Sequence, residues 1–183
     1  LGRPNLPILR DPDKIPDVDY FICESTYGGR FHDTFDISEG KLAEVIKKAY
    51  QRNAKIIVPS FSVGRTQELV YLLNKIFLAE KAPRIPVYVD SPLSVNATEI
   101  FRLHPECFDF ETSQFLLKNK DPFGFGMLTY ITDVEDSKEL NSHSGPFMII
   151  SSSGMAEAGR ILHHLANNID NPNNIVLIVG YSA

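Results

Sequence analysis

The chain has 183 residues, of which 43% are hydrophobic and 22% charged, and its net charge at pH 7 is −5. This length fits one domain, or one domain with an appendage, and is enough to bury a core. No apolar run reaches the roughly 20 residues that a membrane-spanning helix needs. The acidic balance argues against binding nucleic acid by bulk attraction, so any polyanion site has to be local. Two cysteines are too few for a disulfide framework, which favours reduced thiols and a cytoplasmic setting.

The first half of the chain alternates between short apolar segments and amphipathic ones. Residues 1–17 are rich in Pro and Asp, show no periodicity and predict an extended surface segment. Residues 19–24 (DYFICE) predict a strand that runs into a hydroxyl-rich turn. Apolar residues recur at helical spacing over 38–53 and again from 65 to about 80, so we expect helices there. Between them, residues 54–59 (AKIIVP) predict a second strand.

The second half keeps the same alternation. The elements expected there are, in order, a strand at 85–90, a helix at 95–103, a strand at 128–132, a helix at 134–141 and, near the end, a strand at 175–179. Asp133 is placed to open the helix at 134–141 as its N-cap. The stretch 104–126 carries five phenylalanines without a clear period, which predicts an irregular packed lid with a short helix at 113–119.

The stretch 147–165, FMIISSSGMAEAGRILHHL, combines a strand with a turn and a helix. Its four apolar residues at 147–150 predict a buried central strand, three serines and Gly154 form the turn, and a helix is expected from about Ala156. A helix N-terminus after a parallel strand is a ready anion site, because its first N–H groups lack partners and its dipole favours negative charge. Gly154 permits close approach of a ligand, and Arg160 is placed to hold a phosphate through two hydrogen bonds.

Strands that alternate with helices predict an α/β fold with a mainly parallel sheet and helices on both faces. Ligands of such sheets collect at the carboxyl ends of the strands. Four expected strands end in serine-bearing turns. The turns carry Ser25, Ser60 with Ser62, Ser91, and Ser151 to Ser153. Three arginines, Arg30, Arg65 and Arg160, follow shortly downstream of these turns. The serines and arginines together predict one polar rim and a phosphate-bearing ligand.

Common catalytic and nucleotide motifs are absent. The chain has no G-x-x-x-x-G-K-[ST], no G-x-G-x-x-G and no G-x-S-x-G, which removes the main support for standard nucleotide and hydrolase interpretations. His163 and His164 are adjacent, and on a helix they point about 100° apart. They therefore cannot bind one metal together as an i, i+4 pair would, and packing in the core or on the helix surface is favoured. Metal catalysis by residues of this chain alone is not expected.

Several segments resemble a known family. The segment ESTYGGRFH at 24–32 is similar to the stretch that carries the motif A acid of the β-CASP family of metallo-β-lactamase-fold nucleases. Further similar segments follow in the family's order. They are VPSFSVGRTQELVYLL at 58–73, PVYVDSPLS at 86–94, DPFGF at 121–125 with LTYITDVEDSKELN at 128–141, SSSGMAEAGRILHHL at 151–165 and IVGY at 178–181. The resemblance is closest to the RNA-processing branch, with bacterial and archaeal ribonucleases and the endonuclease subunit of the pre-mRNA 3′-end cleavage machinery.

The resemblance also shows which family parts are not in this sequence. The family's H-x-H-x-D-H zinc ligands and the histidines of motifs B and C have no counterpart here, and neither His32 nor His163 matches them. We therefore expect residues 1–27 to be a lead-in segment and strand of a metallo-β-lactamase core, and residues 28–183 to be the β-CASP domain, as a fragment of a longer protein. The resemblance implies two Zn²⁺ ions in that protein, bound outside this chain, and metal-assisted hydrolysis of RNA phosphodiester bonds.

Site roles follow from the resemblance residue by residue. Glu24 matches the motif A acid and would orient a metal ligand or a catalytic histidine from the missing segments. The implied contacts to RNA phosphates or terminal nucleotides are Ser62, Arg65, Ser152, Ser153, Gly154, Met155 and Arg160. Further RNA contacts are expected from Tyr27, Arg30, Phe61 and Ser91, with the two aromatic rings either stacking on bases or simply packing. The implied partners are single-stranded RNA and the metallo-β-lactamase core of the same polypeptide; no membrane is involved, and a homodimer is left open.

Two other interpretations remain open from the sequence. In one, the longer protein is a non-catalytic β-CASP subunit that binds RNA or scaffolds a processing complex. In the other, the chain is a free-standing α/β module for a small phosphorylated ligand. Neither of these interpretations includes hydrolysis. Under the ribonuclease interpretation, the fragment alone lacks the metal ligands and is expected to be inactive.

Overall fold

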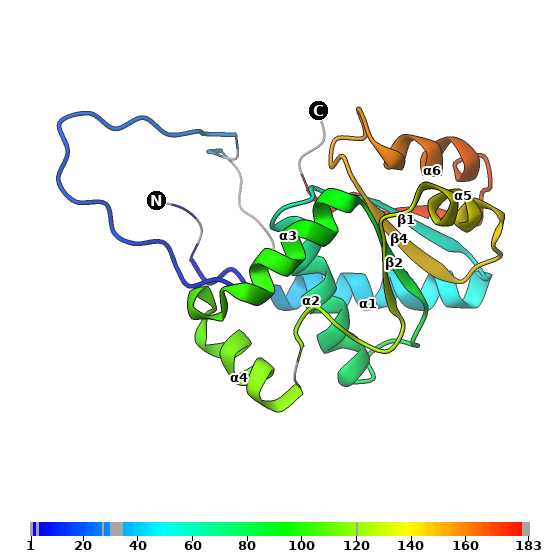
Figure 1. Ribbon diagram of the computed structural model, residues 1–183, viewed down its shortest axis with the longest axis horizontal. Coiled ribbons are helices and arrows are strands. Elements are labelled where there is room, and N and C mark those ends of the chain that lie inside the picture. The colour runs from blue at the N-terminus through cyan, green and yellow to red at the C-terminus, as the bar shows by residue number, and fades with distance from the viewer. Residues whose placement is uncertain (1, 3, 27, 30–34, 120, 181–183) are drawn as a thin grey trace.

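The computed structural model describes residues 2, 4–26, 28–29, 35–119 and 121–180 (Figure 1). Its centre is a five-stranded sheet in the order β3-β2-β4-β1-β5, and all four strand pairs are parallel. The strands are β1 (Lys55–Pro59), β2 (Val87–Asp90), β3 (Leu128–Ile131), β4 (Phe147–Ser151) and β5 (Ile175–Val176). The expected central strand at 147–150 is confirmed, because β4 is the middle strand of the sheet.

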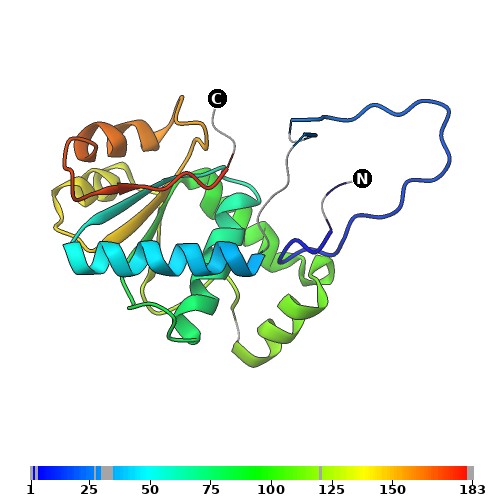
Figure 2. The ribbon, with the colours of Figure 1, turned by 180° about the vertical axis from the view of Figure 1, so that it is seen from behind.

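Helices cover both faces of this sheet, as expected (Figures 1 and 2). The α-helices of the described residues are α1 (Phe35–Arg52), α2 (Arg65–Leu78), α3 (Pro92–Leu103), α4 (Phe110–Asn119), α5 (Val134–Ser142) and α6 (Arg160–Asn168), with a short 3₁₀ helix, η1, at Pro105–Cys107. Helices α1 and α2 pack on one face in the larger core cluster, and α5 and α6 pack on the other face. No helix in the described ranges is both long and apolar enough to cross a bilayer.

The two faces follow from the alternation of side chains along each strand. In β4, Met148 and Ile150 join the larger cluster, whereas Ile149 joins the cluster under α5 and α6. In β1, Val58 likewise joins the larger cluster, and Ile57 joins the cluster under α5 and α6. All five residues of each of these two strands are buried, which explains why both read as continuous apolar runs in the sequence.

The expected strand at 19–24 is wrong. These residues have no regular secondary structure and belong to an N-terminal segment that loops away from the sheet in Figure 1. Tyr20 and Ile22 are 92% and 97% exposed, so this apolar run has no sheet to pack against in the described chain. The segment is anchored further upstream, where Leu9 forms an isolated bridge with Phe108.

Several element boundaries also differ from expectation. Helix α6 begins at Arg160 rather than near Ala156, because Gly159 has a positive φ of 84° and Ala156 one of 56°, neither of which a helix allows. Helix α3 begins earlier than expected, since Ser91 caps it and Pro92 fits its first position. Helix α4 extends the short helix expected at 113–119, and β5 is shorter than the strand expected at 175–179.

Candidate nucleic-acid interface

Three of the four predicted serine turns meet at the carboxyl edge of the sheet. The hydroxyl of Ser91, after β2, lies 2.8 Å from that of Ser152, after β4, and 3.4 Å from that of Ser62, after β1. We call Ser62, Ser91 and Ser152 the serine rim. Ser25, the fourth predicted member, lies in the exposed N-terminal segment, outside the sheet.

One hydroxyl proton of the serine rim has no acceptor within the rim. A hydroxyl group has one proton and two lone pairs, and Ser91 Oγ already accepts the backbone N–H of Ser94 at 3.2 Å. Of its two contacts with Ser62 and Ser152, Ser91 therefore accepts one and donates the other. The hydroxyls then point in one direction along the rim, and the last of them has no acceptor within it. That proton is available to a bound anion.

The turn between β4 and α6 offers further donors. Ser153 Oγ accepts the backbone N–H groups of Glu157 and Ala158 at 3.2 and 3.3 Å, which leaves its own proton free to be donated. No hydrogen bond from the backbone N–H of Gly154 or Met155 is found within the part of the chain that the structure describes. These two N–H groups are therefore available as donors to an anion.

Phe61 packs directly on Gly154. A Cβ atom at Gly154 would lie 2.6 Å from Phe61 Cδ2, so only glycine allows the ring to reach the turn. The Phe61 side chain is nonetheless 41% exposed. The Phe61 ring thus packs on the turn and also keeps a solvent-exposed surface. Both expectations, packing and stacking on a base, are compatible with this position.

Arg65 and Gln67 are both on α2, but they have different surroundings. Arg65 is 44% exposed and pairs with Glu68 at 2.7 Å. Gln67 is fully buried, and its amide nitrogen donates to Ser62 O at 3.1 Å and to Thr98 Oγ1 on α3 at 2.9 Å. Gln67 therefore joins the turn after β1 to α3, although its sequence position had indicated no such role.

Arg160 points to a buried carboxylate rather than to open solvent. Its Nη1 lies 2.6 Å from Asp90 Oδ1 and 3.2 Å from Asp133 O, and its Nη2 lies 2.6 Å from Thr132 O. Its side chain is 19% exposed, and Asp90 is 0% exposed. Three of its five N–H groups are therefore held within the protein, and its Nε has no hydrogen bond to a described residue.

The Asp90 carboxylate contacts side chains from two helices, α5 and α6. Besides Arg160, it accepts the hydroxyl of Ser137 on α5 and contacts His164 Nε2 on α6 at 2.6 Å. Burial by itself would raise the pKa of Asp90, but the hydrogen bonds from His164, Ser137 and Arg160 together hold it below its usual range. His164 is fully buried, which agrees with the expected core packing. Asp90 was not predicted as a functional residue, and only its place after an apolar strand could have drawn attention to it.

The expected acid, Glu24, lies in the exposed N-terminal segment. Its carboxylate accepts the backbone N–H of Thr26 at 2.8 Å, which lowers the pKa of Glu24. It does not end a strand, contrary to expectation. Tyr27 and Arg30, two further expected RNA contacts, lie outside the described residues.

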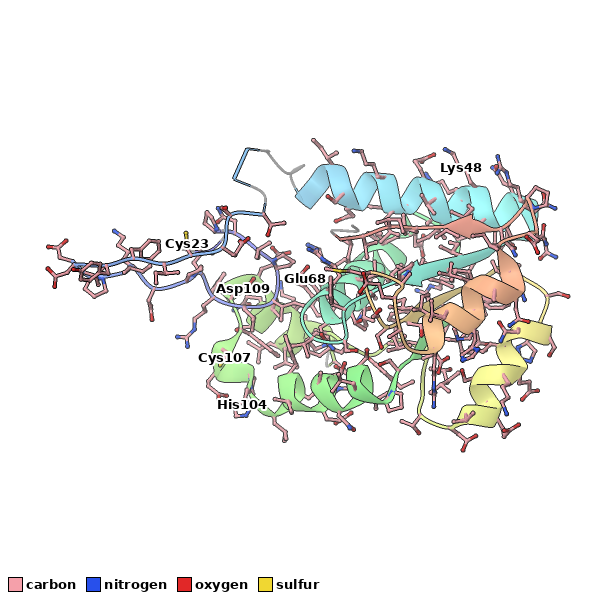
Figure 3. The ribbon with its side chains drawn as sticks, turned by 90° about the horizontal axis from the view of Figure 1, so that it is seen from above. Cys23, Lys48, Glu68, His104, Cys107 and Asp109 are labelled. Atoms are coloured by element: carbon pink, nitrogen blue, oxygen red, sulfur yellow. The ribbon has the colours of Figure 1, made fainter. Side chains whose placement is uncertain are left out.

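Metal-binding residues do not gather in the described ranges, which contain no group of three or more His, Cys, Asp or Glu side chains able to hold an ion. Figure 3 shows Cys23 on the N-terminal segment and Cys107 beside the start of α4, and both thiols are exposed and free. The residues present therefore do not fit a zinc centre by themselves.

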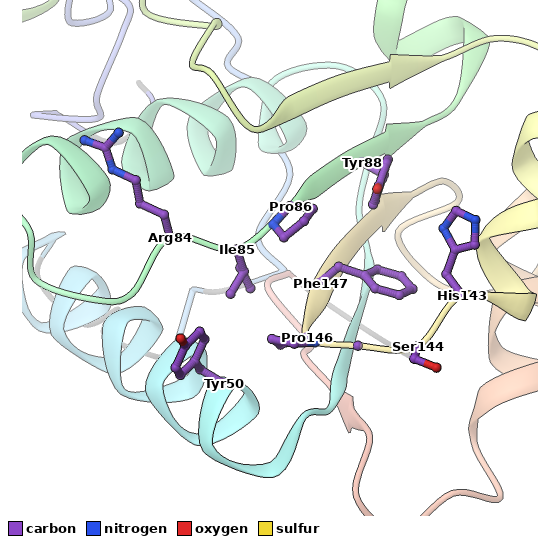
Figure 4. Close-up of a pocket in the computed structure, with 10 residues that line it drawn as sticks. Tyr50, Arg84, Ile85, Pro86, Tyr88, His143, Ser144, Pro146 and Phe147 are labelled. Carbon is purple, nitrogen blue, oxygen red and sulfur yellow. The ribbon is translucent and has the colours of Figure 1, made fainter.

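A hollow of about 490 Å³ lies at the opposite, amino end of β2 and β4 (Figure 4). Its walls include Tyr50 from α1, Tyr88 from β2 and Phe147 from β4. None of the predicted site residues lines it. The candidate interface is thus the opposite edge of the sheet, where the serine rim lies.

The fold and the rim together define a parallel α/β domain that presents hydroxyl and N–H donors at the carboxyl ends of its strands. A model of one family, described as the Beta-Casp domain, matches residues 66–183. The chain belongs to the β-CASP family, as its motifs predicted.

Individual relatives carry RNA-related names. The chain is 33% identical over 181 residues to ribonuclease TTHA0252 of Thermus thermophilus, a match that covers 99% of this chain and 42% of that protein. Transcription termination factor FttA of Methanosarcina mazei is 29% identical, with 96% of this chain and 28% of that protein covered. Endoribonuclease ysh1 of Schizosaccharomyces pombe is 27% identical, with 97% and 23% covered. The chain thus spans less than half the length of these relatives.

Proposed function

We propose that this chain is the RNA-holding β-CASP portion of a metal-dependent ribonuclease. The serine rim, the turn at 153–155 and Arg65 would take backbone phosphates or the last nucleotides of single-stranded RNA, with Phe61 available for stacking. The observation that carries the proposal is the convergence of Ser62, Ser91 and Ser152 at one edge of the sheet. The names of the relatives support RNA as the polyanion.

The proposal assigns hydrolysis to the longer protein. Because the described residues hold no metal cluster, the two zinc ions would be bound by a metallo-β-lactamase core outside this sequence. Residues 1–27 would pack with that core, which would also give the exposed Tyr20 and Ile22 a partner. Glu24 would orient a metal ligand or catalytic histidine of the core, and its exposed carboxylate is free of ion pairs with described residues.

The test is a pair of serine variants in the full-length protein. Ser152→Ala removes a rim hydroxyl, and Ser144→Ala removes an exposed hydroxyl beside the hollow at the other end of the sheet. We expect Ser152→Ala to weaken binding of a 5′-phosphorylated single-stranded RNA roughly tenfold, the usual loss for a hydrogen bond to a charged group. Zinc content, measured by atomic absorption, should stay unchanged.

The control defines what would contradict the proposal. Ser144→Ala should bind RNA as the wild type does. Equal affinity of Ser152→Ala and wild type would contradict a phosphate contact at the rim, and loss of zinc from Ser152→Ala would point to a different role for this edge.

A further inference from the structure

The protonation of His164 can be worked out from its hydrogen-bond partners. The backbone oxygen of His164 only accepts, so the Asn168 atom 2.8 Å from it is the amide nitrogen. The same nitrogen lies 3.1 Å from Asn141, which therefore presents its amide oxygen. That oxygen also lies 3.1 Å from His164 Nδ1 and can only accept, so Nδ1 carries a proton.

The other ring nitrogen faces a carboxylate. His164 Nε2 lies 2.6 Å from Asp90 Oδ2, and a bare lone pair at that distance would repel the carboxylate oxygen. Asp90 also accepts from Arg160 and Ser137, and these bonds favour its ionised form. Nε2 therefore carries a proton as well, and the ring is an imidazolium.

We infer that His164 is a cationic positioning residue that holds α6 to Asp90. With His164 protonated, the cluster of Asp90, Arg160 and His164 has a net charge of +1. This cluster lies directly behind the serine rim. One carboxylate faces two cations there. Asp90 adjoins Ser91 in the chain, and its backbone oxygen accepts the hydroxyl of Ser151, the residue before Ser152. The surplus charge thus lies next to two of the three rim turns.

A buried net charge is unfavourable unless an opposite charge lies nearby. A phosphate at the rim would supply that charge, so the cluster favours an anion there without touching it. The inference deepens the proposed function and rests on RNA phosphates binding at the rim. It also gives Arg160 a role through Asp90, beside the phosphate contact expected from the sequence.

The first experiment measures the protonation state of the His164 ring. In the ¹⁵N-labelled chain at pH 7, we expect both ring nitrogens of His164 to carry protons in two-dimensional ¹H–¹⁵N NMR spectra. The neighbouring His163 is exposed on the same helix and serves as the internal comparison. A singly protonated His164 ring would overturn the inference, and because the measurement uses the wild type, it decides even if variants fail to fold.

The second experiment separates charge from structure. His164→Gln keeps a hydrogen-bond donor towards Asp90 but removes the charge, and we expect it to bind a single-stranded RNA about tenfold more weakly, with His163→Gln unchanged. A probe of the same sequence with an uncharged methylphosphonate backbone should bind wild type and His164→Gln alike. Equal weakening with both probes would show a purely structural role and overturn the inference.

The two proposals fail separately. A singly protonated ring rejects the role of His164, whatever the affinity of the protein for RNA. Unchanged RNA binding by Ser152→Ala rejects the proposed function, even where the ring carries both protons.

Discussion

At the scale of single residues, Asp90 links the stability of the fold to pH. Hydrogen bonds from His164, Ser137 and Arg160 outweigh its burial and keep its folded-state pKa below the unfolded value of about 3.9. Between the two values the unfolded chain binds more protons, so stability rises with pH in that window. The contribution of Asp90 is therefore present above about pH 4 and is lost as the pH falls through the folded-state pKa.

We predict that Asp90→Asn lowers the free energy of unfolding at pH 7 by about 3–5 kcal/mol, because Arg160 and His164 lose the charge that compensates them. Asparagine does not titrate, so the variant should also lose less stability than the wild type below about pH 4. Urea denaturation between pH 7 and pH 3 measures both effects. The exposed Asp170→Asn is the control, and parallel pH curves for wild type and Asp90→Asn would contradict the argument.

Residue-level chemistry was only partly predictable from the sequence. Ser62, Ser91 and Ser152 could be predicted to meet, because each follows an apolar strand and parallel strands end at one edge. Gln67 and Asp90 could not, since their partners lie on other elements and are brought together only by packing. Arg160 illustrates the same limit: its position after a serine turn predicted a phosphate contact but gave no sign of its carboxylate partner, which lies 70 residues away.

At the scale of elements, the start of α6 depends on a glycine. Gly159 has a φ of +84°, and a Cβ atom there would lie 2.3 Å from Ser152 O, which is backbone and cannot move aside cheaply. We predict that Gly159→Ala destabilises the protein by at least about 1–3 kcal/mol, the usual range for such backbone strain alone. The midpoint of urea unfolding measures the loss.

Gly40 provides a matched control with the opposite expected sign. It lies inside α1, and a Cβ atom there meets nothing within 4 Å. Gly40→Ala should therefore stabilise the protein by about 0.5–1 kcal/mol, since alanine favours a helix over glycine. A Gly159→Ala variant as stable as the wild type would contradict the positive φ of Gly159 and its close approach to Ser152 O.

Elements with a local signal were predicted well. Asp133 caps α5 as expected, accepting the N–H groups of Glu135 and Asp136, because an N-cap acts within its own turn. The expected strand at 19–24 is wrong because a strand needs a neighbouring strand, and a short apolar run alone does not supply one. The late start of α6 was missed for a related reason: the backbone of residues 156–159 is shaped by contacts with Ser152 and Ser153 that helical periodicity does not record.

At the scale of the whole molecule, the net charge of −5 and the local donors of the rim together predict how RNA affinity depends on salt concentration. For single-stranded nucleic acid, the logarithm of affinity falls with the logarithm of salt concentration by about 0.7 per phosphate neutralised. A site built from the rim, the turn at 153–155 and Arg65 neutralises about one or two phosphates. We therefore predict weak binding by this chain with a slope of about −0.7 to −1.4 between 50 and 200 mM salt, measured by fluorescence anisotropy.

The same chain should not cleave its RNA. The described residues gather no metal site, and the rim offers hydrogen-bond donors but no group placed to activate water. Adding Zn²⁺ should leave the RNA intact on a denaturing gel, while the full-length protein cleaves it. Hydrolysis by this chain that depends on added metal would contradict the placement of catalysis elsewhere. A much steeper salt slope would instead contradict a local anion site. An acidic protein reaches a steep slope only when many separate groups contact phosphates.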